Sequence, residues 1–127
     1  MILRRFTLAM FLLAAPAVRA QYNRTDMIKL AADRCDMAAN KLNLSQEQVT
    51  AIHPLLESRY VDLGQVKDVY RASDKSDASK KKAKDSLESI EAKYNARINS
   101  ILTPKQAKAW KHMQQKDWKD DLILPKS

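Results

Sequence analysis

Glycine is almost missing from this chain: of its 127 residues, only Gly64 is a glycine. Glycine-rich phosphate loops, nucleophile elbows and strands bounded by glycine turns are therefore not expected, and no metalloprotease helix motif is present. Both phenylalanines fall within the first eleven residues, and the rest is rich in the helix formers Ala, Lys, Glu, Gln and Leu. The composition predicts an all-α protein that is not an enzyme and binds no cofactor.

Long hydrophobic runs are absent beyond the first twenty residues. Residues 1–20 carry two arginines, then an apolar run from Phe6 to Val18, and end in Val18-Arg19-Ala20, which is typical of a secretory signal. The run is shorter than the roughly 20 apolar residues that span a bilayer, although an uncleaved anchor is the alternative. We expect cleavage after Ala20, a soluble domain of residues 21–127, and a location in the periplasm.

Acidic residues are outnumbered, with 15 Asp and Glu against 23 Lys and Arg and a net charge of +8. Three of the basic residues and none of the acidic ones lie in the leader, so cleavage leaves 20 basic against 15 acidic residues, a net charge of +5. An exported basic protein does not meet chromosomal nucleic acid. The expected partners are unfolded polypeptides, anionic lipid head groups or an acidic face of another envelope protein.

Apolar residues recur at helical spacing in four segments, which run from Tyr22 to Asn43, from Ser45 to about Ala72, from the Ser73–Ser79 turn to Leu102, and from Thr103 onward. Thr25 is the expected N-cap of the first helix. The four apolar stripes are Ile28, Ala31, Cys35, Ala38 and Leu42; Val49, Ile52, Leu56, Leu63, Val66 and Tyr70; Ala83, Leu87, Ile90, Tyr94, Ile98 and Ile101; and Ala107, Trp110, Met113 and Trp118.

The second and third helices carry matching stripes across a short polar turn, which predicts an elongated antiparallel hairpin flanked by the other two helices. Arg59 is the one break in the second stripe, and Pro54 should kink or break that helix. Leu55 and Val69 widen the stripe of the second helix to a second apolar face. Long single stripes cannot make a round core in a chain of this size, so this second face should be buried in a partner. We therefore expect a curved, cradle-like antiparallel homodimer.

Two copies of one short motif frame the hairpin: Leu44-Ser45-Gln46-Glu47-Gln48 and Leu102-Thr103-Pro104-Lys105-Gln106. Each has the pattern of a capping box, in which a hydroxyl accepts from the N3 backbone N–H while the N3 Gln reaches back to the N-cap N–H. Pro104 falls at N1, where a missing N–H costs nothing. Because the second helix begins where the third ends, the boxes should meet there as a structural clasp. Its residues are Leu44, Ser45, Gln48, Leu102, Thr103 and Gln106.

The paired motifs resemble the LTxxQ repeat of the Spy/CpxP-like periplasmic proteins. The second copy, LTPKQ, fits the repeat fully, and the first, LSQEQ, replaces Thr by Ser and keeps the hydroxyl. The flanking residues 42–45 and 98–103 are also similar, and the resemblance covers most of the chain after the leader. Members of that family include chaperones, stress-sensor inhibitors and metal-resistance proteins, so the resemblance implies a fold more narrowly than a function.

Three functions stay open at this point. The first is an ATP-independent periplasmic holdase that binds unfolded or aggregation-prone envelope proteins. The second is an adaptor or inhibitor that docks on the periplasmic domain of an envelope stress sensor kinase. The third is a periplasmic metal-binding resistance protein.

Basic and aromatic side chains alternate along the hairpin and are the candidate client-binding residues. Charge would draw an unfolded chain in, and apolar spots would retain it. The alternative is ordinary packing with snorkelling Lys and Arg side chains. These candidates are Arg59, Tyr60, Lys67, Tyr70, Arg71, Lys93 and Arg97.

Metal ligands are sparse. His53 and His112, with Cys35, Met37 and Met113, could form a soft or borderline site. Neither histidine has a second histidine four residues away, so surface positions are favoured and no metal is expected. The single cysteine, Cys35, could link two chains in an oxidising compartment, but a small buried apolar residue is the favoured interpretation.

Overall fold

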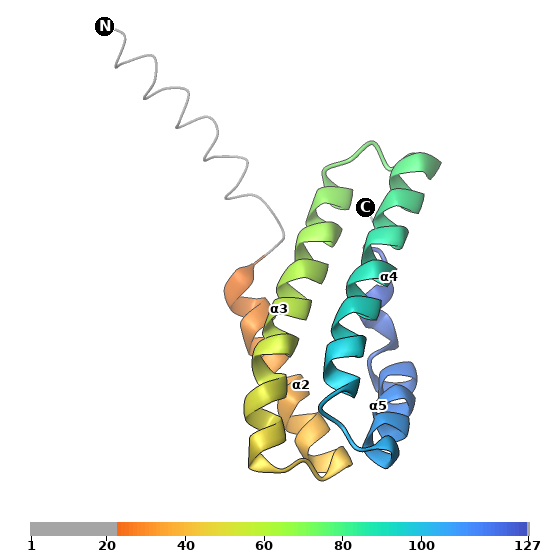
Figure 1. The fold of residues 1–127 in the computed structure, drawn as a ribbon. Coiled ribbons are helices and arrows are strands. Elements are labelled where there is room, and N and C mark those ends of the chain that lie inside the picture. The colour runs from red at the N-terminus through yellow and green to blue at the C-terminus, as the bar shows by residue number, and fades with distance from the viewer. Residues whose placement is uncertain (1–22, 127) are drawn as a thin grey trace, which may run out of the picture.

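The computed structural model describes residues 23–126, which are helical throughout apart from short connections (Figure 1). The elements are α2 (Arg24–Leu42), α3 (Gln46–Arg71), α4 (Asp77–Asn99), α5 (Pro104–Asp117) and the 3-10 turn η1 (Lys119–Leu122). Helices hold 83% of the described residues, and no strand occurs among them. The all-α prediction with four helices is confirmed. The expected signal peptide lies outside the described residues, and the homodimer stays a prediction.

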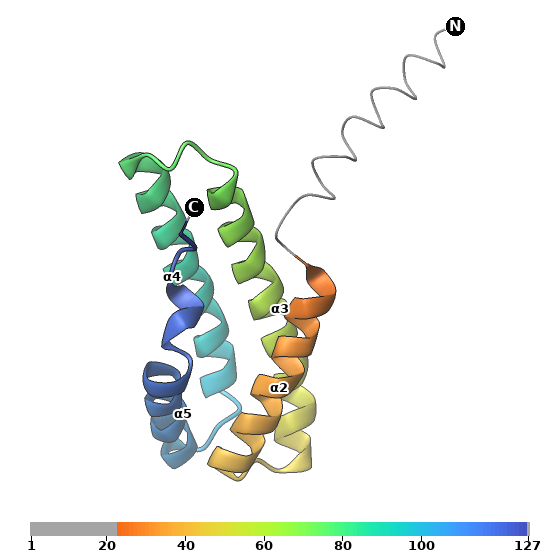
Figure 2. The same cartoon turned by 180° about the vertical axis from the view of Figure 1, so that it is seen from behind.

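The helices form two layers. α3 and α4 make the predicted antiparallel hairpin, and α2 and α5 lie behind it in Figure 1 and in front of it in Figure 2. The turn end of the hairpin extends beyond α2 and α5, so the second layer covers only part of its length. No helix within residues 23–126 is long and apolar enough to cross a bilayer.

Each α-helix begins at a side-chain cap. Ser45, Ser76 and Thr103 cap the last three helices as N-cap residues. The expected N-cap Thr25 is wrong by two positions: Asn23 Oδ1 accepts from the backbone N–H groups of Thr25 (2.9 Å) and Asp26 (3.3 Å). An asparagine here offers the same kind of short acceptor as a threonine, and it lies one residue before the first helical position.

Helix α3 continues through Pro54, so the expected break does not occur. Ile52 and Leu56 on either side are both fully buried, at 0% exposure. Proline removes one backbone hydrogen bond. The burial of two large apolar side chains holds both halves of the helix in one continuous element.

The core lies between the layers and follows the predicted stripes. Its buried apolar members are Ala31, Cys35, Ala38, Leu42, Ile52, Leu56, Tyr60, Leu63, Leu87, Ile98, Leu102, Trp110, Met113 and Trp118. Ile28 departs from the prediction, because it is 37% exposed in the first turns of α2. Cys35 is a free, buried thiol, as favoured, and burial raises its pKa. Gly64 is also buried, and it lines a cavity with Met27 and Leu30 of α2.

Candidate functional site

Both predicted capping boxes form. The Ser45 hydroxyl accepts from the Gln48 N–H (3.2 Å), and Gln48 Oε1 accepts from the Ser45 N–H (2.9 Å). Thr103 and Gln106 repeat the arrangement at 3.2 and 3.0 Å. Pro104 occupies the first helical position of α5, as expected. The local chemistry of the motif is therefore confirmed in both copies.

The two glutamines also bind each other, as the expected meeting of the boxes requires. Gln48 Nε2 donates to Gln106 Oε1 (2.7 Å) and to the Ile101 carbonyl (3.2 Å). In return Gln106 Nε2 donates to Gln48 Oε1 (3.2 Å) and to the Leu42 carbonyl (3.2 Å). Each side chain thus caps its own helix and holds the loop that precedes the other helix. We call Ser45, Gln48, Thr103 and Gln106, with the buried Leu102 and half-buried Leu44, the clasp.

The clasp can be tested by separating capping from interlocking. Thr103→Ala or Ser45→Ala should each lower the free energy of unfolding by about 1 kcal/mol, the usual effect of losing an N-cap. Gln106→Glu keeps the acceptor for the Thr103 N–H but loses the donor to Leu42 and Gln48. It should cost about 1–3 kcal/mol, because those acceptors lose their partner beside a new charge. Urea denaturation measures each value.

The matched control is Gln115→Glu on the exposed side of α5, which should change the free energy by less than about 0.5 kcal/mol. The carboxyl introduced at position 106 should have a raised pKa in the folded state, because only its protonated form can donate. Its penalty should therefore be full above that pKa and shrink as the pH falls through it. A Gln106→Glu chain as stable as the control at neutral pH would show that the interlock contributes nothing.

A second polar cluster lies within the core and centres on Arg59. The Arg59 side chain is only 1% exposed, and it donates through Nη1 to Asp121 Oδ2 (3.0 Å) and through Nη2 to Glu91 Oε2 (3.1 Å). The Tyr60 hydroxyl donates to the same Asp121 oxygen (2.7 Å), and Arg34 Nη2 lies 3.5 Å from Asp121 Oδ1. Two cations and two carboxylates are thus balanced inside the fold. We call Arg34, Arg59, Tyr60, Glu91 and Asp121 the polar core.

The polar core reaches every helical element. Glu91 Oε1 accepts from Asn95 (3.0 Å) and Gln114 (2.9 Å), which joins α4 to α5. The Arg34 guanidinium lies 5.2 Å from the centre of the Trp118 ring, and that ring meets Trp110 edge to face at 5.0 Å. The cluster therefore attaches the C-terminal segment, with Asp121 and Trp118, to all the other elements.

The surroundings of the polar core favour a protonated Tyr60 hydroxyl and a charged Arg59 guanidinium. Burial raises the pKa of Tyr60, so its hydroxyl keeps the proton that it donates to Asp121. Burial opposes the charge of Arg59, but Tyr60, Glu91 and Asp121 outweigh that effect and raise the pKa of the guanidinium. A buried, paired and charged arginine of this kind holds a fold in one arrangement. Its Nε has no hydrogen-bond partner, but only 1% of the side chain is exposed, so this donor is not accessible to a client.

The structure divides the candidate client-binding residues. Arg59 and Tyr60 are 1% and 2% exposed and belong to the core, which fits the alternative of ordinary packing and leaves them little surface for a client. Tyr70 is also buried, at 8%. The remaining four are accessible: Lys67 and Arg71 are half-buried beside a cavity, while Lys93 and Arg97 are exposed on α4.

One feature of the sequence indicates the polar core, namely the position of Arg59 within the apolar stripe of α3. Arg59 lies three residues after Leu56 and four before Leu63, so it occupies a core position of the stripe. A charge in such a position needs a buried partner. That partner, Asp121, is 62 residues away in a segment without helical periodicity, so its identity was not readable.

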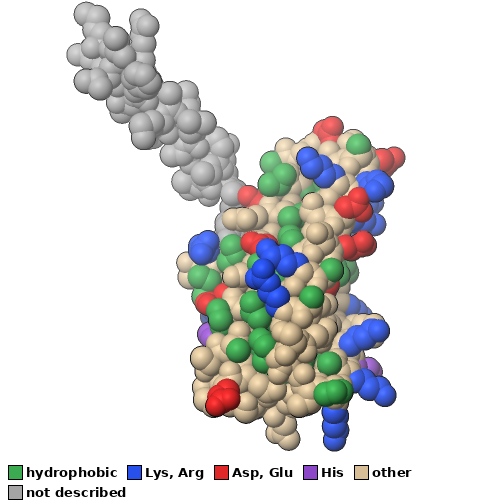
Figure 3. Space-filling model, viewed as in Figure 1, with side chains coloured by type: hydrophobic (Ala, Val, Ile, Leu, Met, Phe, Trp, Pro, Cys, Tyr) green, Lys and Arg blue, Asp and Glu red, His purple; other side chains and the backbone are tan. Residues whose placement is uncertain are grey.

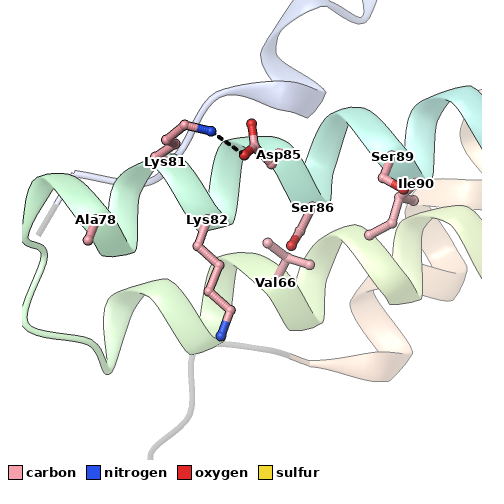
Figure 4. A pocket seen from close by; sticks show the side chains of 8 residues that line it. All are labelled: Val66, Ala78, Lys81, Lys82, Asp85, Ser86, Ser89 and Ile90. Atoms are coloured by element: carbon pink, nitrogen blue, oxygen red, sulfur yellow. Dashed lines mark hydrogen bonds and ion pairs between the residues drawn. The ribbon is translucent and has the colours of Figure 1, made fainter.

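An open groove runs between α3 and α4 near the turn of the hairpin. Its volume is about 540 Å³, and its apolar walls include Val66, Tyr70, Ala83 and Ile90. Val69 at its edge is 71% exposed. Lys82 extends from α4 toward α3, to the left of Val66 and Ser86 in Figure 4. We call this the hairpin groove.

The face that contains α3 and α4 mixes hydrophobic side chains with Lys and Arg side chains (Figure 3). A shallow hollow of about 730 Å³ continues from the hairpin groove along α4, where Lys81 and Asp85 form an exposed ion pair at 2.7 Å. Lys93 lies nearby on α4, with its Nζ 5.0 Å from the centre of the Tyr94 ring. Accessible apolar and cationic groups therefore share this face.

Within residues 23–126, no three His, Cys, Asp or Glu side chains gather as a set of metal ligands. His53 is half-buried and its Nε2 has no hydrogen-bond partner, whereas His112 is exposed. The Met37 sulfur already accepts from the Trp118 indole N–H at 3.2 Å. These residues supply no geometry that supports a metal-binding function.

A scan against models of protein families, a search of curated proteins and a search of solved structures each found no match to this chain. The likeness to the LTxxQ proteins therefore depends on the two motifs and the residues beside them.

Proposed function

We propose that this chain is an exported, ATP-independent chaperone of the Spy/CpxP-like kind, which holds unfolded or aggregation-prone envelope proteins. The observation that carries the proposal is the hairpin groove, an open apolar surface next to exposed cations. Contiguous apolar surface rimmed by polar residues is a common mark of a binding site, whereas a single exposed apolar residue needs no explanation. Val69, 71% exposed, extends the apolar wall of this groove.

The surface suits weak binding of many sequences. A groove of about 540 Å³ accepts a few side chains of an extended polypeptide and leaves the rest in water. The exposed amines of Lys82 and Lys93 and the guanidinium of Arg97 would attract acidic stretches of an unfolded chain. Apolar contacts would then slow dissociation. Such binding uses no nucleotide, in keeping with the lack of a phosphate loop.

We expect the purified protein, without nucleotide, to suppress aggregation of an unrelated unfolding client at near-stoichiometric ratios, as followed by light scattering. Raising salt should slow capture, because the Debye length falls from about 10 Å at 0.1 M to about 3 Å at 1 M. Val69→Ser with Lys82→Ser should weaken suppression without changing helicity. The control pair is Ile123→Ser, 58% exposed away from the groove, with Lys108→Ser on α5.

A chain that never slows aggregation at several-fold excess would contradict the proposal. If that chain instead bound the periplasmic domain of a stress sensor tightly, and the groove variant lost this binding, the adaptor function would replace the holdase. Equal suppression by the groove variant and the control pair would place client binding elsewhere on the molecule. Sedimentation at micromolar concentration tests the predicted homodimer in the same samples.

A further inference from the structure

A separate cavity of about 210 Å³ lies between the first turns of α2 and the middle of α3, beside the polar core. One part of its wall is apolar and is formed by Met27, Leu30, Leu63 and Gly64. The other part carries the side chains of Tyr60, Lys67, Arg71 and Asp121. The hairpin groove shares none of these residues, so the cavity is a distinct feature of the surface.

The cavity is lined by two cations and one carboxylate, so the fold compensates its positive charge only in part. Lys67 and Arg71 are one helical turn apart on α3, a spacing at which like charges repel. The ion pairs given for the described residues, at Arg34, Lys41, Arg59 and Lys81, include neither of these two cations. Desolvation lowers the pKa of Lys67, so its charge is held where water is scarce. Half-buried cations in this state favour an anionic partner.

Asp121 attracts Lys67 and raises the pKa of its amine, but less than desolvation lowers it, and the Asp121 oxygens are bound elsewhere. Its Oδ2 accepts from Arg59 (3.0 Å) and Tyr60 (2.7 Å), and its Oδ1 faces Arg34 (3.5 Å). Glu91 is likewise engaged by Arg59. The exposed Asp120 exerts only the weakest of the named influences on Lys67. Positive charge therefore remains in excess around the cavity.

We propose that this cavity binds a small monocarboxylate with a short apolar chain. The carboxylate would lie between Lys67 and Arg71, where a guanidinium can donate two parallel hydrogen bonds. The chain would contact Met27, whose flexible side chain adapts to different shapes, and Leu30. Gly64 leaves the space that a larger side chain would fill.

Size and charge narrow the ligand class. At roughly 30 Å³ per water molecule, the cavity of about 210 Å³ displaces about seven waters, so it suits a molecule of about seven to ten non-hydrogen atoms. Nucleotides are too large, and inorganic phosphate would leave the apolar wall without a partner. The carboxylate could belong to a free short-chain acid or to the C-terminal residue of a polypeptide, and the experiment separates these sources.

The only glycine of the chain lines the cavity, so selective [15N]glycine labelling places a single amide resonance at the site. Titration of the purified protein with hexanoate should shift this resonance saturably. Hexan-1-ol and hexylammonium at matched ionic strength should not, because they lack the carboxylate. Lys67→Met and Arg71→Met should each weaken hexanoate binding by about tenfold or more, and Lys108→Met should leave it unchanged.

A second variant tests whether a loss of hexanoate binding could be due to misfolding. Leu30→Trp fills the cavity, retains both cations and keeps the glycine probe, so it should abolish binding while the circular dichroism spectrum is unchanged. Equal shifts with hexanoate and hexan-1-ol, or unchanged affinity in folded Lys67→Met, would overturn the proposal. Tighter binding of N-formylvaline than of hexanoate, with no binding of N-formylvalinamide, would assign the carboxylate to a polypeptide terminus; the reverse order would assign it to a free acid.

Discussion

Replacing Arg59 with methionine should lower the free energy of unfolding by about 3–5 kcal/mol, the usual effect of removing one partner from a buried ion pair. The guanidinium is the main partner of Asp121 and also binds Glu91. Without it, Asp121 keeps only Tyr60 and the more distant Arg34. Small domains have a total stability of only about 5–15 kcal/mol, so the loss is a large share. Urea denaturation followed by tryptophan fluorescence gives the value.

The control is Lys93→Met, which removes an exposed cation from α4 and should cost less than about 0.5 kcal/mol. The double variant Arg59→Met with Asp121→Leu should recover part of the loss, because it removes the carboxylate left unpaired by the first change. An Arg59→Met chain as stable as the Lys93→Met control would mean that Arg59 does not organise the core.

Trp118→Ala should also destabilise the protein by about 3–5 kcal/mol, as expected for truncating a large buried aromatic residue. Trp118 is 2% exposed, meets Trp110 edge to face and donates to the Met37 sulfur. Its loss should also loosen η1 and with it Asp121. Hydrogen exchange should therefore report faster exchange for amides of α3 near Arg59, in addition to the lower midpoint of denaturation.

Ile123→Ala provides the comparison within the same segment, because Ile123 is 58% exposed and should tolerate truncation within about 0.5 kcal/mol. Combining Trp118→Ala with Arg59→Met should cost less than the sum of the two, since both release the same contacts. Strict additivity would show that the aromatic pair and the polar core are independent.

The features that depend on local pattern were predictable from the sequence. Helical periodicity gave the four helices, and the hydroxyl-to-glutamine spacing gave both capping boxes, because caps involve residues only three positions apart. The meeting of the two capping boxes followed from the hairpin topology, whereas the hydrogen bonds between Gln48 and Gln106 were not predicted. At Pro54 the local rule that proline breaks a helix did not hold, because the burial of Ile52 and Leu56 keeps α3 continuous.

The features that depend on distant partners were not predictable. The sequence marked Arg59 as the break in the apolar stripe and as a candidate client-binding residue. Its buried partner could not be predicted, because the segment that supplies Asp121 has no periodic pattern. The cavity at Lys67 likewise requires the crossing of α2 over α3 at Gly64.

The hairpin is closed at both ends, by residues 72–76 of the chain at one and by the paired glutamines at the other. Because α3 and α4 are connected at both ends, they cannot separate by a hinge motion at one end. They can only rotate about their own axes or bend apart at mid-length. The width of the groove between α3 and α4 is thus decided by the side chains along it. A polypeptide segment that binds in this groove must therefore adapt its own shape, because the distance between α3 and α4 stays nearly constant.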